Sequence, residues 1–262
     1  IAFLPAGLLA DHIANRGVVL AGTFFWVGFG YLAASFSNSF WAFALLIALA
    51  NMADATWHPI ATGVLAQIHK SRRAYALGVH AIGGHVAEVI TLPACGLLLS
   101  LWDWRLAIQV LIIPTLLMGV YFVLIHHHVP RHVNSRPTRA DFLAIWRIWS
   151  SGAGLRVISI FVTYNMGLFA IITMTPLYLS QNHSFSWLQT GTVMAVMMLA
   201  GALAQPGTGK LSDRIGRRPL IVAGNGIAAA AALAAWWSTE ILFTLIALGL
   251  ALTMLVAIRS VL

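Results

Sequence analysis

Long apolar stretches are the feature that most constrains how this chain can fold. Eight runs of roughly 20 mostly apolar residues follow a shorter run at Ile1–Ala10. A helix needs about 20 such residues to cross the hydrocarbon core of a bilayer. The runs are too long for barrel strands and do not alternate with a period of two residues. We therefore predict an all-α membrane protein whose complete spans are Gly17–Ser35, Phe40–Leu65, Tyr75–Leu101, Leu106–His126, Leu155–Tyr178, Trp187–Gly209, Pro219–Trp237 and Ile241–Leu262.

The composition supports a lipid environment. Hydrophobic residues make up 60% of the 262 residues, and charged residues make up 8%. A soluble domain carries about 25% charged residues, and only lipid as a solvent removes the need for them. The single cysteine, Cys95, excludes an internal disulfide. Because Ile1 and Leu262 both lie in apolar runs, we expect the chain to be cut from inside one transmembrane helix to inside another.

The basic residues show how the spans are oriented. Most of the 15 lysines and arginines fall in every second loop, and the opposite loops hold only Arg105. Such a bias places the basic loops in the cytoplasm. We therefore expect a multi-pass protein of the cell membrane, in bacteria the inner membrane, with its charged loops inside. The net charge of +8 does not indicate nucleic-acid binding, which needs one contiguous basic face on a soluble module.

The longest loop divides the predicted helices into two groups. It is polar and basic and contains Pro130 and Pro137. We expect an N-terminal half-bundle in residues 1–126, a cytoplasmic linker in 127–154 and a C-terminal half-bundle in 155–262. The other loops are short, so sequential helices should pack antiparallel.

A short loop motif occurs twice, in Gly7–Arg16 and again in Gly209–Arg218. Each copy joins the end of one span to the start of the next on the predicted cytoplasmic side. The glycine that opens each copy should permit close approach of two backbones. The first copy contains Asp11 and the second contains Asp213. Asp213 should cap or complement a helix N-terminus.

The second copy has the complete pattern G-x-L-x-D-x-x-G-R-[RK] and resembles the short-loop signature of the major facilitator superfamily. The first copy departs from it at Ala14, which replaces the second glycine. The resemblance implies twelve helices in two pseudo-symmetric halves, of which this chain runs from the second helix into the tenth. It also implies that the loop latches one conformation, although the loop could serve only as a topology anchor. The motif residues are Gly7, Asp11, Arg16, Gly209, Asp213, Arg214, Gly216, Arg217 and Arg218.

Ionisable residues inside the spans are the strongest site candidates, because charges in hydrocarbon usually face a cavity or a partner. Asp54 and His58 lie one helical turn apart on one face, and Pro59 should disturb the hydrogen-bond ladder beside them. His85 and Glu88 lie three residues apart in the next span. Each pair could bind substrate or relay protons, or could lock the packing of neighbouring helices.

Three further features leave alternatives open. Arg259 could bind an anionic substrate or anchor its helix at the membrane surface. Asn165 could hydrogen-bond the substrate or contact another helix. The His126–His128 run, with His132, does not predict a metal site, because adjacent side chains on a helix point in different directions.

We expect secondary active transport by alternating access, coupled to protons, with no cofactor. The chain has no GxxxxGK[ST] nucleotide-binding motif and no HExxH or GxSxG motif, so an ATP-driven pump and an intramembrane enzyme are disfavoured. His58-Pro59 and the glycines of Gly78–Gly84 loosely resemble fosmidomycin-resistance-like exporters, which favours efflux of a drug or metabolite. The alternatives are a proton-linked importer of a carboxylate or sugar and a non-transporting membrane sensor. The expected partners are the lipid bilayer, a small solute and protons, and we expect a monomer.

Overall fold

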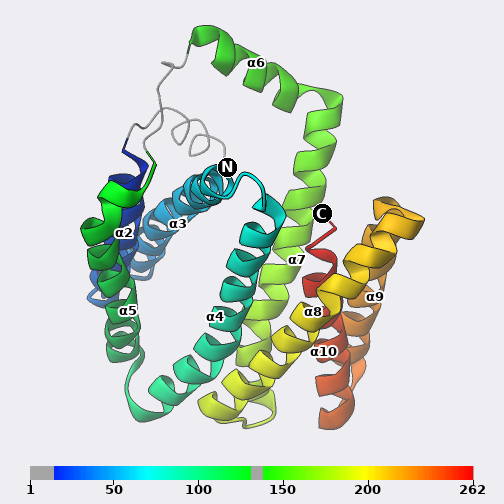
Figure 1. Ribbon diagram of the computed structural model, residues 1–262. Coiled ribbons are helices and arrows are strands. Elements are labelled where there is room, and N and C mark those ends of the chain that lie inside the picture. The colour runs from blue at the N-terminus through cyan, green and yellow to red at the C-terminus, as the bar shows by residue number, and fades with distance from the viewer. Residues whose placement is uncertain (1–14, 131–137, 262) are drawn as a thin grey trace. The chain divides into compact units, whose positions relative to one another are not determined.

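The computed structural model describes residues 15–130 and 138–261 and places long helices in both ranges (Figure 1). Eight of the described helices are long and apolar enough to cross a membrane, which confirms the eight complete spans. The partial run at Ile1–Ala10 lies outside the described residues. The eight helices are α2 (Arg16–Ser35), α3 (Phe40–Ile68), α4 (Arg73–Leu101), α5 (Trp104–Ile125), α7 (Gly152–Asn182), α8 (Trp187–Ile215), α9 (Arg217–Trp237) and α10 (Ile241–Ile258).

Two shorter elements separate α5 from α7. The histidine run His126–His128 forms the 3-10 turn η1, and Arg139–Ser150 forms the helix α6. Both lie largely within the predicted cytoplasmic linker, 127–154, for which the sequence predicts no helix. The 12 residues of α6 are too few to span a bilayer, and the Trp146 side chain on this helix is 72% exposed.

Two compact units make up the chain. The first contains the residues up to Ile82 together with Trp102–Leu143. In this unit α2 packs against both α3 and α5, and the Phe24 ring is stacked on Phe122 and meets Trp57 edge-on. Small residues allow α2 to approach α3 closely, since a Cβ atom added to Gly30 would lie 2.8 Å from the Cβ of Ala50.

The turn between α4 and α5 ties two loops of the first unit together. Asp103 caps α5 by accepting hydrogen bonds from the backbone N–H groups of Arg105 and Leu106, at 2.8 and 3.3 Å. The Arg105 guanidinium donates to the carbonyl oxygen of Ser37, at 2.9 Å, and to the side chain of Asn38, at 3.0 Å. The turn therefore fixes the start of α5 against the α2–α3 loop.

The second unit contains Gly83–Leu101 of α4 and all residues from Ala144 onward. Here α10 packs against α7, α8 and α9 (Figure 1). Leu252 of α10 and Met194 of α8 are fully buried in the core of this unit. The predicted division into residues 1–126, 127–154 and 155–262 stays a prediction.

Candidate functional site

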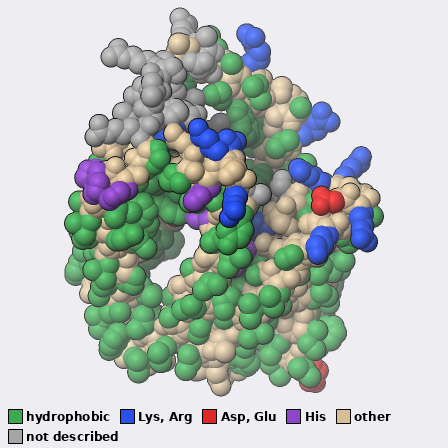
Figure 2. Space-filling view, viewed as in Figure 1, with side chains coloured by type: hydrophobic (Ala, Val, Ile, Leu, Met, Phe, Trp, Pro, Cys, Tyr) green, Lys and Arg blue, Asp and Glu red, His purple; other side chains and the backbone are tan. Residues whose placement is uncertain are grey.

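The second copy of the loop motif forms a one-residue connection between two helices. α8 ends at Ile215 and α9 begins at Arg217, so only Gly216 lies between them. Gly216 has φ +88°, a conformation that side chains disfavour, and its N–H donates to the carbonyl of Ser212 at 2.9 Å. Figure 2 shows lysine and arginine side chains gathered where α8 joins α9, beyond the hydrophobic surface of these helices. Arg214, Arg217 and Arg218 of the motif are all exposed.

Two predictions about this loop are wrong. Asp213 lies in the last turn of α8 and does not cap α9, because the N-cap residue of α9 is Gly216, which makes no side-chain capping bond. A Cβ atom added to Gly209 would meet nothing within 4 Å in the described part of the chain, so Gly209 permits no close approach there. The glycine that the turn requires is Gly216. Of the first copy, Gly7 and Asp11 lie outside the described residues, and the buried Arg16 donates to the Gln67 amide oxygen at 3.2 Å.

Asp54 and His58 form a pair on one face of α3, as predicted. His58 Nε2 lies 3.9 Å from Asp54 Oδ2, and the two side chains are 48% and 60% exposed. The helix is not broken beside them, because α3 runs continuously from Phe40 to Ile68 through Pro59, which removes only its own hydrogen bond from the ladder. The Thr62 hydroxyl donates to the His58 carbonyl at 2.8 Å within this helix.

A tryptophan lies beside this pair. The Trp57 ring centroid is 5.2 Å from that of His58 and 5.4 Å from that of His80 on α4. Its indole nitrogen is buried and has no hydrogen-bond partner in the described parts of the chain. Tyr31 of α2 hydrogen-bonds Asn51, one turn before Asp54 on α3. The first unit therefore has a polar and aromatic face on α3.

A chain of polar contacts joins three helices in the second unit. Arg259, at the end of α10, has its Nη1 3.4 Å from Glu88 Oε1. The other carboxylate oxygen, Glu88 Oε2, lies 3.4 Å from His85 Nδ1 on the same helix, α4. The His85 Nε2 atom lies 3.0 Å from the Gln205 amide oxygen on α8. Gln205 Nε2 in turn donates to the carbonyl of Val256 on α10 at 3.1 Å.

The contact between Gln205 and the Val256 carbonyl determines which atoms donate and which accept in this series of hydrogen bonds. A backbone carbonyl can only accept, so the amide nitrogen of Gln205 faces Val256 and the amide oxygen faces His85. His85 Nε2 must then carry the hydrogen that it donates to Gln205. In a neutral imidazole, Nδ1 is consequently a bare lone pair directed at a Glu88 oxygen. A proton added between His85 and Glu88 turns two opposed acceptors into a hydrogen bond.

The structure thus brings together three of the six predicted substrate or coupling residues: His85, Glu88 and Arg259. Asn165 is half-buried and donates to the Phe161 carbonyl of its own helix at 2.8 Å. Sequence reasoning missed Gln205, although this amide lies inside a predicted apolar span and is the kind of residue that marks an interhelical contact.

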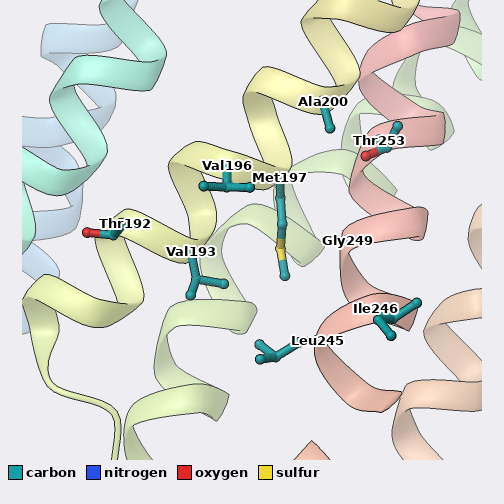
Figure 3. Close-up of a pocket in the computed structure, with 9 residues that line it drawn as sticks. All are labelled: Thr192, Val193, Val196, Met197, Ala200, Leu245, Ile246, Gly249 and Thr253. Carbon is teal, nitrogen blue, oxygen red and sulfur yellow. The ribbon is translucent and has the colours of Figure 1, made fainter. Parts of the chain in front are cut away.

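An apolar cavity of about 390 Å³ lies between α8 and α10 in the same unit (Figure 3). Met197 of α8 and Leu245 of α10 point into the space between the two helices, and Met197 reaches over Gly249. The polar side chains in its lining are Thr192 and Thr253, and no ionisable group lines it. The cavity can accommodate apolar groups.

Hydrophobic helices with polar groups that meet across helix boundaries are typical of a polytopic membrane carrier. The family model of the Major Facilitator Superfamily matches residues 1–261. The chain belongs to the major facilitator superfamily, which confirms the resemblance read from the loop motif. It is a multi-pass membrane protein of a transporter family, not an enzyme.

Two curated relatives are transporters. The Probable 4-methylmuconolactone transporter of Cupriavidus pinatubonensis is 26% identical over 231 residues, which cover 83% of this chain and 52% of that protein. The Proline/betaine transporter of Salmonella typhimurium is 39% identical over 80 residues, which cover 30% of this chain and 15% of that protein. The chain thus spans about half the length of the first relative and a smaller part of the second.

Solved structures show the same fold. A bacterial homolog of the human lysosomal transporter Spinster, inward-facing and unoccupied, matches with a TM-score of 0.73 and 19% identity, over 100% of this chain and 63% of that one. A peptide transporter POT in complex with alafosfalin matches with a TM-score of 0.67 and 12% identity, over 98% of this chain and 68% of that one. Together with the family match, these confirm the predicted all-α transporter fold.

Proposed function

We propose that the protein is a proton-coupled secondary active transporter of a small organic solute, and that His85 and Glu88 hold the coupling proton. The observation that carries this proposal is the hydrogen-bond polarity set by Gln205, which leaves His85 Nδ1 and Glu88 Oε2 as facing acceptors 3.4 Å apart. One proton between His85 Nδ1 and Glu88 Oε2 allows the two atoms to form a hydrogen bond.

Protonation at this contact also changes what holds α4 to α10. The ionised Glu88 attracts Arg259 on α10, and a neutral Glu88 does not. A proton can bias two conformations only if it interacts differently with them. Since the Glu88–Arg259 contact bridges two helices, a conformation that separates these helices favours the protonated acid, and one that joins them favours the ionised acid. Alternating access between such states couples proton release to solute movement.

The direction of transport has two candidates. The glycines after His58-Pro59 favour efflux of a drug or metabolite, by antiport with protons. Arg259 favours the second candidate, proton-linked uptake of a small organic acid, because a guanidinium beside a neutralised carboxyl group suits an anionic solute. The similarity to the Proline/betaine transporter supports a solute with a carboxylate group, since proline and betaine both carry one.

The remaining features of the proposal concern the membrane. The basic loop at Gly216 would lie on the cytoplasmic side, where exposed arginines meet anionic lipid. The loop would act there as a latch, since a one-residue connection limits how α8 and α9 can move apart. The Asp54–His58 pair in the first unit would bind substrate or relay protons.

The test uses the protein as its gene encodes it, in proteoliposomes with an imposed pH gradient and radiolabelled proline and betaine as probes. We expect gradient-driven flux in the parent, and loss of the gradient response with exchange retained in Glu88→Gln. Glu240→Gln is the matched control, because Glu240 is an exposed acid at the start of α10. The sign of the gradient that drives accumulation separates uptake from efflux. Flux in Glu88→Gln and His85→Gln that follows the gradient as in the parent would disprove the coupling site.

A further inference from the structure

We infer that Arg259 receives the carboxylate group of the solute, and that Glu88 releases Arg259 when it takes up a proton. The solute class is therefore a monocarboxylate that binds together with one proton. This inference rests on the proposed function and names the solute class of the same site.

The geometry of the Glu88–Arg259 contact allows a solute carboxylate to take the place of Glu88. A charge-assisted N–H···O⁻ bond is about 2.7–2.9 Å long, and arginine prefers to hold a carboxylate with two parallel bonds. Here one guanidinium nitrogen lies 3.4 Å from one carboxylate oxygen, and the Arg259 side chain is 55% exposed. The guanidinium has five N–H donors, so a solute carboxylate that approaches it can form the bidentate pair that Glu88 does not form.

The charges around this contact make the proton and the carboxylate depend on each other. α4 contributes Glu88 and His85, α10 contributes Arg259, and α8 contributes the uncharged Gln205. From α7, the Tyr164 hydroxyl donates to the Leu255 carbonyl near the end of α10 and carries no charge. Of the acids described in this unit, Glu88 alone lies in the middle of a spanning helix, because Asp213 lies in the last turn of α8 and Glu240 lies just before α10.

Charge balance then decides which ligand fits. With Glu88 ionised and His85 neutral, the cluster has no net charge. A proton at Glu88 leaves the Arg259 guanidinium without its carboxylate partner, and the cluster then has a net charge of +1. One carboxylate restores neutrality, whereas a neutral amide does not and a dianion exceeds it. By linkage, the proton raises the affinity for the carboxylate and the carboxylate raises the affinity for the proton by the same factor.

Joint binding sets the direction of coupling. A solute and a proton that occupy the site together cross the membrane together. A monocarboxylate and a proton have no net charge between them, so the loaded site has the same net charge as the empty site. The inference therefore selects symport, and hence uptake under an inward proton gradient, over the antiport that efflux requires.

The test measures ligand binding by thermal unfolding of the protein in lipid nanodiscs. The probes are two acids and their amides: benzoate with benzamide, and acetate with acetamide. Each is titrated at about pH 7.5 and about pH 6, where a carboxylic acid with a pKa of about 4 stays ionised. We expect at least one acid to stabilise the protein, its amide to have no effect, and the acid to bind on the order of 5- to 150-fold more tightly at the lower pH.

Two variants separate the roles of the residues. Arg259→Gln should abolish the response to the acid, and Glu88→Gln should bind the acid equally at both pH values. Arg156→Gln is the matched control, since this exposed arginine bonds the Gly152 carbonyl of its own helix, and it should respond as the parent does. If Arg259→Gln fails to fold, Arg259→Lys replaces it. The lysine keeps the charge but not the two parallel bonds, so it should weaken binding without abolishing it.

Three results would overturn the inference: no acid stabilises the parent, the amides act as well as the acids, or Glu88→Gln keeps the pH dependence. These outcomes are distinguishable from failure of the proposed function. If gradient-driven flux of a neutral solute still depends on Glu88, the proton site stands and the carboxylate assignment falls. If Glu88→Gln transports as the parent does, the proton site itself is wrong.

Discussion

The pairing of Arg259 with Glu88 predicts a measurable interaction energy between α10 and α4. Two unit charges about 4 Å apart attract by about 4 kcal/mol at an effective dielectric constant near 20. The two side chains are 55% and 38% exposed, however, and exposed ion pairs contribute about 0.2–1 kcal/mol. Polar contacts between membrane helices average about 0.6 kcal/mol and reach about 1.7 kcal/mol. We therefore expect an interaction of about 1 kcal/mol.

A double-mutant cycle measures this interaction directly. Glu88→Gln, Arg259→Gln and the double variant are compared with the parent by SDS-induced unfolding in micelles, monitored by circular dichroism. The double variant should lose about 1 kcal/mol less than the two single variants added together. Glu88→Gln combined with Arg156→Gln is the control cycle and should be additive. If the Arg259 cycle is also additive, within about 0.3 kcal/mol, the two charges do not interact and the reasoning fails.

Three stability predictions follow from the packing and the turns, each measured by the same unfolding assay. Gly201→Ala places a Cβ atom 2.5 Å from the Val256 Cβ and should cost about 1–3 kcal/mol, whereas Gly209→Ala, in open space, should not destabilise the protein. Gly216→Ala should cost about 1–2 kcal/mol because its φ of +88° is unfavourable for any residue with a side chain, and no loss would show that the turn relaxes. Asp103→Ala should cost about 1 kcal/mol of stability through loss of the α5 cap. Asp103→Asn should keep most of the stabilisation, because its amide oxygen can accept the same hydrogen bonds.

The spans were predictable because their signal is local. A helix that crosses a bilayer must be apolar over about 20 residues, wherever its neighbours lie. The helix α6 was missed for the complementary reason, since its 12 residues lack the length of a span and follow a segment rich in prolines and basic residues. Pro59 shows the limit of a local rule, because α3 continues through it.

The site was predictable only in its parts. The spacing of His85 and Glu88 places them on one helix face, and the cost of charge in hydrocarbon marks both as candidates. Spacing along the chain contains no information about which distant side chain they meet. The role of Gln205 was not predicted, because it depends on the orientation of the side-chain amide. The Val256 carbonyl determines that orientation.

The sequence by itself determined that this is a membrane protein and located the eight spans found among the described residues, and the motif ending at Arg218 indicated its family. These properties depend on composition, on length and on a short loop. Only the tertiary structure decided that Arg259 meets Glu88, 171 positions earlier in the chain, and that Gln205 orients His85 between them. Partners on different helices are chosen by how the helices pack, and packing depends on the shapes of all the faces at once.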